Sequence, residues 1–135
     1  MRSTSNPAVL AVIAAGGALG ALARWGLSVA WPAPRHGFPW ATLVTNASGC
    51  LLIGVLMVLV TEVWTGRPLL RPFLGVGLLG GFTTFSTYTV DVVRLAGAGA
   101  SRTALAYLAA TVVAALVAVY AGTALARLGI RRGRP

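Results

Sequence analysis

The stretch GGFTTFSTYTVD, residues 80–91, lies inside a long apolar segment and yet carries five serine or threonine hydroxyls, three aromatic rings and an acid. Lipid offers no hydrogen-bond partners, so polar groups at that depth must be satisfied by protein, water or an ion. The two glycines and the threonines after them predict a helix that is interrupted near the middle of a membrane. Such a break frees backbone carbonyl oxygens, which suit a hard cation such as sodium.

The composition of the chain is that of a membrane protein. Of 135 residues, 57% are hydrophobic and 10% are charged, whereas a soluble domain carries about 25% charged residues. Each apolar run reaches the roughly 20 residues that a helix needs to cross a bilayer. We therefore predict one all-α transmembrane domain over residues 1–135. Its four spans are expected at about 8–31, 40–63, 69–95 and 102–127.

All eleven positive charges are arginines, and they divide unevenly between the two sides of the membrane. Positive charge on cytoplasmic loops sets the orientation of a membrane protein. The C-terminal arginines favour cytoplasmic termini, but the remaining arginines are nearly balanced, so insertion in both directions is permitted. The side with both termini carries Arg2, Arg67, Arg71, Arg127, Arg131, Arg132 and Arg134, and the other carries Arg24, Arg35, Arg94 and Arg102. Because these arginines are scattered between apolar spans, we expect them to set the topology and to contact lipid headgroups rather than to bind nucleic acid.

The first, second and fourth spans each carry a patterned helical face. In the first, Gly16, Gly20 and Arg24 recur every four residues, which favours close helix packing for the glycines. Arg24 either reaches the membrane surface or serves a vestibule. Asn46, within the second span, either joins two helices or marks a transport pathway. In the fourth span, Thr103, Tyr107, Thr111 and Ala115 share one face, which is most often packing.

Three motifs together resemble the Fluc/CrcB family of fluoride channels. They are GGALGALARW at 16–25, TLVTNASGCLLIG at 42–54 and GGFTTFSTYTVD at 80–91, in that order in a four-span chain. The third motif is close to the GGLTTFSTF signature of that family, which is followed by an acid. The resemblance implies an antiparallel, dual-topology dimer with two pores and a central sodium ion. The partner would be a second copy or an oppositely oriented homologue.

The resemblance also implies a function and a location. Fluoride enters cells as neutral HF, dissociates, and leaves passively through such a channel in the cell membrane, which lowers its cellular concentration. Carried over by motif, the sodium ligands are the carbonyls of Gly80 and Thr83, and Arg24 is the arginine of the first helix. The implied fluoride path comprises Thr42, Asn46, Phe85, Ser86, Thr87, Tyr88, Tyr107 and Thr111. Tyr88 replaces a common Phe, and Asp91 replaces the more usual Glu.

These residue types suit a small, strongly hydrated anion. Amide and hydroxyl donors can replace its water, and aromatic rings presented edge-on offer their positive edges. Conduction also requires attraction weak enough for release, which neutral donors provide.

Two other functions fit a four-span chain less well. A small multidrug-type, proton-coupled antiporter needs a carboxylate deep in the first span, whereas the only acids are Glu62 and Asp91. An inert helical scaffold would leave the polar third span without a purpose. An enzyme is not expected, because there is one histidine, His36, and one cysteine, Cys50, with no nucleophile beside a base.

Overall fold

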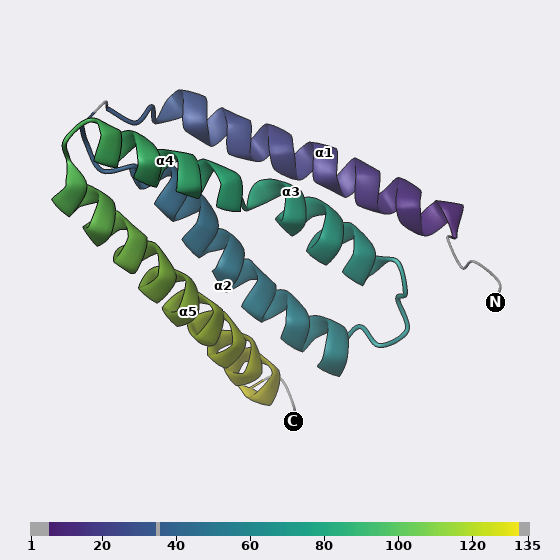
Figure 1. The fold of residues 1–135 in the computed structure, drawn as a ribbon. Helices are drawn as coiled ribbons and strands as arrows, with labels where there is room; N and C mark the ends of the chain where they lie inside the picture. The colour runs from purple at the N-terminus through teal and green to yellow at the C-terminus, as the bar shows by residue number, and fades with distance from the viewer. Residues whose placement is uncertain (1–5, 35, 133–135) are drawn as a thin grey trace, which may run out of the picture.

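The computed structural model describes residues 6–34 and 36–132 and is entirely helical over that part of the chain (Figure 1). Its elements are α1 (Pro7–Ala30), α2 (Trp40–Glu62), η1 (Arg71–Leu79), α3 (Gly80–Phe82), α4 (Phe85–Gly97) and α5 (Ser101–Arg132). η1 is a π-helix, and with α3 and α4 it forms one segment long enough to cross a membrane. The prediction of four helices long and apolar enough to cross a membrane is therefore confirmed.

Local sequence explains where the helices begin and turn. Asn6 caps α1 by accepting a hydrogen bond from the Ala8 amide at 3.1 Å, and Pro7 occupies the first turn. Between α4 and α5, Gly99 adopts a positive φ of 78°, a conformation that glycine takes without steric cost. The Ala100 amide bonds back to the Leu95 carbonyl at 2.9 Å. The chain therefore reverses tightly, and α5 runs antiparallel to α4 (Figure 1).

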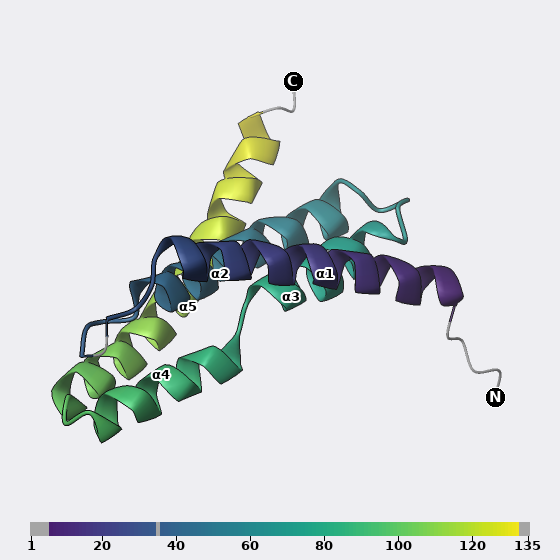
Figure 2. The ribbon, with the colours of Figure 1, turned by 90° about the horizontal axis from the view of Figure 1, so that it is seen from above.

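The fourth span is longer than the sequence predicted. α5 continues to Arg132, so its 32 residues extend about 48 Å, well beyond the roughly 30 Å of a hydrocarbon core. Figure 2 shows its C-terminal part projecting away from the other helices. Arg131 and Arg132 lie in the last turn, where positive charge complements the helix dipole. The helix therefore continues five residues past the predicted membrane span, which ends at residue 127.

Glycines bring two pairs of helices into backbone contact. α1 packs along η1 and α3, and α2 packs along α5 (Figure 1). A Cβ atom on Gly20 would collide with the Leu78 carbonyl, and one on Gly122 would collide with the Leu51 carbonyl. The predicted packing role of the glycine face in the first span is confirmed. Small residues allow this approach in lipid, where the hydrophobic effect does not drive helices together.

The apolar surface of a single chain is extensive. Leu22, Leu105 and Leu116 are each more than 60% exposed. Half of the buried hydrophobic residues form a small cluster, Leu95, Ala104 and Tyr107, near the α4–α5 turn. Contiguous exposure of this kind is rare in soluble monomers. It fits a chain whose outer faces meet lipid or another protein.

Candidate functional site

The interruption of the third span lies at two threonines. Thr83 and Thr84 have extended backbone conformations between α3 and α4, whereas Gly80 is still helical with φ −63° and ψ −36°. A Cβ atom on Gly81 would collide with the Gly17 carbonyl, so this glycine is needed for contact with α1. The predicted break is confirmed, and it lies at the threonines that follow the glycine pair.

Asn46 of α2 holds the broken backbone. Its Oδ1 accepts a hydrogen bond from the Thr84 amide at 2.8 Å, and its Nδ2 donates to the Thr84 carbonyl at 2.8 Å. One side chain thus satisfies both polar backbone groups of a residue that has left the helix. The amide nitrogen carries two hydrogens, and within the described residues only one of them has a partner. The interpretation that Asn46 joins two helices is therefore correct, and one hydrogen of its Nδ2 remains available as a donor.

Thr84 also caps the second half of the span. Its Oγ1 accepts from the Thr87 amide at 3.1 Å and donates to the Thr87 hydroxyl at 3.1 Å. The Ser86 hydroxyl lies 3.3 Å away. Sequence reasoning left Thr84 out of the site, although a threonine directly before a helix start is a typical N-cap signal.

A cavity of about 490 Å³, here called the main cavity, lies against the break. It is walled by α2, η1, α3, α4 and α5, and its lining contains no charged residue and no histidine among those described. Of the predicted site residues it brings together Asn46, Gly80, Thr83, Phe85, Tyr88 and Thr111. Cys50 also borders it.

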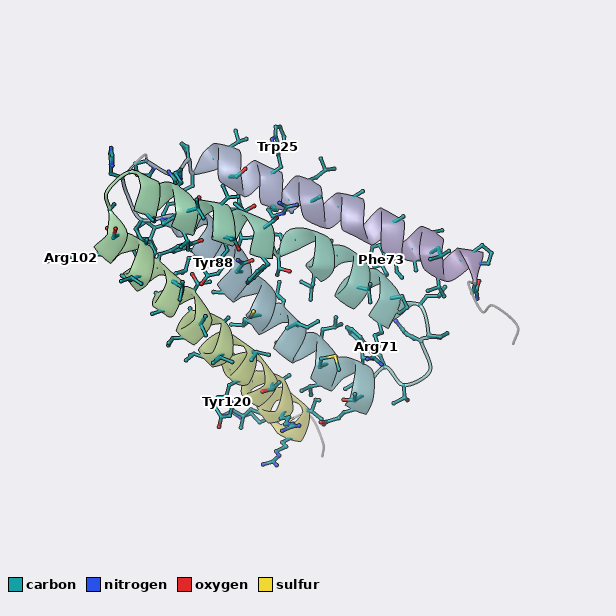
Figure 3. The ribbon with its side chains drawn as sticks, viewed as in Figure 1. Trp25, Arg71, Phe73, Tyr88, Arg102 and Tyr120 are labelled. Atoms are coloured by element: carbon teal, nitrogen blue, oxygen red, sulfur yellow. The ribbon has the colours of Figure 1, made fainter. Side chains whose placement is uncertain are left out.

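The two aromatic rings predicted to face the ion stand side by side on α4. The ring centroids of Phe85 and Tyr88 are 5.7 Å apart, and Phe85 is 78% exposed in the single chain. Tyr88 extends from α4 toward α5 (Figure 3), where its hydroxyl donates to the Leu108 carbonyl at 3.2 Å. The extra hydroxyl of Tyr88 is therefore bound to α5, which leaves the ring itself to line the main cavity.

A second cavity of about 290 Å³, here called the arginine cavity, lies between α1, α2 and α4. Arg24 borders it and donates from Nε to the Gly81 carbonyl at 3.2 Å, next to the break. Thr42 and Thr87 also line this cavity, while Thr84 lines both cavities. The predicted polar residues are thus divided between two spaces that meet at the broken backbone.

Three predicted residues border neither cavity. Ser86 is exposed on α4, whereas Asp91 on the same helix and Tyr107 on α5 are buried. The Tyr107 and Thr111 hydroxyls are buried next to each other, but neither makes a well-formed hydrogen bond in the described part of the chain. Unsatisfied buried hydroxyls cost stability, so each such group in a native structure calls for an explanation.

Asp91 is fully engaged by its neighbours. Its Oδ2 accepts from the Thr42 hydroxyl at 2.8 Å, and its Oδ1 accepts from Arg94 Nη2 at 3.1 Å. These contacts tie α4 to α2 beside the arginine cavity.

Comparison with known proteins connects this arrangement with a family. Residues 11–123 match the family described as CrcB-like protein, Camphor Resistance (CrcB). The chain belongs to the CrcB family. The matched range includes both cavities and the broken span, and it confirms the resemblance carried by the three sequence motifs.

Several CrcB relatives carry the name fluoride-specific ion channel. One is FluC 2 of Nocardia farcinica, 58% identical over 90% of this chain and 87% of that protein. FluC 1 of Streptomyces coelicolor is 56% identical over 88% of this chain and 77% of that protein. FluC of Rhodospirillum centenum is 42% identical over 90% of this chain and 98% of that protein. The CrcB family is one of channels rather than enzymes, and the match gives the multidrug-type alternative no support.

Proposed function

We propose that this CrcB protein is a fluoride-selective channel of the cell membrane that lets fluoride leave the cytoplasm passively and so lowers its cellular concentration. The names of its relatives and the chemistry of the main cavity both support this function. The lining combines an amide, hydroxyls and two aromatic rings without a fixed charge. A proton-coupled transporter would require a titratable group in its pathway, and the main cavity has no acid among its lining residues.

Neutral donors meet the opposing needs of fluoride conduction. The ion must exchange a tightly bound water shell for donors of similar quality, and yet it must not be trapped. Asn46, which keeps one free Nδ2 hydrogen, and Thr111, which carries a buried hydroxyl, both line the main cavity and would be the donors for an ion there. The positive ring edges of Phe85 and Tyr88 add attraction that is weaker than that of a buried arginine.

The observation that carries this proposal is the lining of the main cavity, which has no charged residue among those described and to which Thr111 belongs. Thr111 lines the main cavity and is only 8% exposed, and its hydroxyl lies beside Tyr107 without a well-formed hydrogen bond in the described residues. A buried hydroxyl without a partner costs about 1–3 kcal/mol. Its presence is explained if the hydroxyl donates to an ion that passes through the cavity.

Thr111→Val is expected to lower fluoride efflux from liposomes by roughly ten-fold while leaving the purified protein as thermally stable or more stable. Valine has nearly the same shape, so the change removes an unsatisfied donor and little else. Thr123→Val on the same helix is the matched control, because its exposed hydroxyl already donates to the Tyr120 carbonyl at 2.7 Å. Unchanged efflux by Thr111→Val would contradict a role for this hydroxyl in conduction.

We further infer that two chains assemble as an antiparallel dimer with two pores. The near balance of arginines outside the C-terminal segment permits both orientations. The large exposed face of Phe85 and the apolar faces of the single chain offer surface for a second copy or an oppositely oriented homologue. A second chain would also enclose the main cavity.

The broken span has free carbonyls suited to the sodium ion that we propose at the dimer centre. The amide that would bond the Gly80 carbonyl in a continuous helix belongs to Thr84 and bonds Asn46 instead. The corresponding amide for Thr83 belongs to Thr87 and bonds the Thr84 hydroxyl. In the described residues neither carbonyl accepts a hydrogen bond. Carbonyl oxygens are ligands for hard cations, so Gly80 and Thr83 fit the role, and sodium would neutralise their partial negative charge.

A further inference from the structure

A carboxylate contacts Thr42, one of the residues that the family resemblance places on the fluoride path. Asp91 is only 8% exposed and is one of two acids in the chain. It bonds Thr42, whose side chain borders the arginine cavity. An uncompensated negative charge at this depth would repel fluoride, because electrostatic interactions are screened poorly away from water. The acid must therefore be neutralised if the pathway is to conduct.

Arg94 is placed to neutralise it. Its Nη2 lies 3.1 Å from Asp91 Oδ1, and its Nη1 donates to the Pro34 carbonyl at 2.9 Å. The guanidinium is thus held at both ends, by the acid and by the segment that joins α1 to α2. The side chain of Arg94 is 31% exposed and that of Asp91 is 11% exposed, so the pair lies at the edge of the packed region.

The contacts with Arg94 and Thr42 also fix the orientation of the Asp91 carboxylate. Oδ1 faces Arg94 on the same helix, and Oδ2 faces Thr42 on α2. With both oxygens occupied, the Thr42 hydroxyl donates to the acid and presents its lone pairs, rather than its hydrogen, to the surroundings. The donors left for an ion in the arginine cavity are then those of Arg24 and of the other residues that line this cavity.

We propose that Arg94 is a positioning residue, which neutralises the Asp91 carboxylate and holds it away from the fluoride path. This inference rests on the proposed function. Arg94 touches no ion itself. It allows an acid to tie α4 to α2 without raising an electrostatic barrier to the anion.

Arg94→Gln is expected to lower fluoride efflux about ten-fold, because it leaves a buried charge without its partner. The decisive variant is Arg94→Gln combined with Asp91→Asn, in which no charge is left unpaired. It is expected to recover efflux to within about three-fold of the unmodified protein, since the repulsion has been removed. Arg102→Gln, at an exposed arginine in the first turn of α5 (Figure 3), is the matched control and should not alter efflux.

Each outcome of this experiment is informative. Normal efflux by folded Arg94→Gln, or a folded double variant as slow as the single variant, would overturn the proposal and leave Arg94 a purely structural role. If the single variant does not fold and the double variant folds and conducts, the uncompensated carboxylate is the cause and the proposal stands. If neither folds, Arg94 is required for the structure itself and the proposal fails. Absence of fluoride efflux from the unmodified protein would instead refute the proposed function.

Discussion

Asn46→Asp should reduce fluoride efflux from liposomes by at least about 100-fold. The aspartate oxygen can still accept from the Thr84 amide, but no donor remains for the Thr84 carbonyl, which Asn46 Nδ2 now serves at 2.8 Å. The change also places a negative charge on the wall of the main cavity. Two unfavourable effects therefore act together: the loss of a hydrogen bond to the interrupted helix and direct repulsion of the ion.

Asn6→Asp is the control for this substitution, since the chain contains only these two asparagines. Asn6 caps α1 far from either cavity, and aspartate is an equally good N-cap. Folded protein and normal efflux are expected. Rapid fluoride efflux through folded Asn46→Asp would mean that the amide only joins helices and that the ion passes elsewhere.

Gly20→Val is expected to abolish the folded state. A Cβ atom at this position would collide with the Leu78 carbonyl and lie 2.7 Å from the Phe82 amide nitrogen. Both obstacles are backbone atoms and cannot move aside as a flexible side chain would. Separating α1 from α3 would also pull Arg24 from the Gly81 carbonyl, which it reaches at 3.2 Å. Overpacking of this kind costs about 1–3 kcal/mol or more, and it is measured by size-exclusion chromatography and thermal unfolding in detergent.

Gly26→Val on the same helix separates packing from helix propensity. Nothing lies within 4 Å of a Cβ atom at Gly26, so the same change should leave folding and stability nearly unaffected. Equal loss of folded protein for both variants would contradict the close contact of α1 with α3. Equal tolerance of both would contradict it as well.

Most of the fold could be predicted because the membrane imposes simple rules. The lengths of the apolar runs and the small-residue face of Gly16 and Gly20 are properties of local sequence, and both are confirmed. The end of α5 could not be read from the apolar run, because hydropathy reports where lipid ends, whereas a helix can continue into water. The arginines of the last turn lie outside the apolar run and yet stay helical.

The candidate site was less accessible to sequence reasoning, because its contacts join distant residues. The hydroxyls around residue 84 marked a polar site, but the clamp between Asn46 and Thr84 spans 38 positions. Nothing local indicates that the Tyr88 hydroxyl would bond α5 rather than face an ion. The separate roles within the predicted break could not be read from the sequence: Gly81 serves contact with α1, and Thr83 and Thr84 carry the irregular backbone.

The central claim is that neutral hydroxyls, one amide and ring edges at bilayer depth replace the hydration shell of fluoride. It is tested most directly by reconstituting the purified protein in liposomes and comparing efflux of fluoride and chloride under the same potassium gradient, with an ion-selective electrode for each. We predict rapid fluoride efflux and chloride efflux at the level of protein-free vesicles. Chloride release as fast as that of fluoride, or release of neither ion by folded protein, would contradict the account.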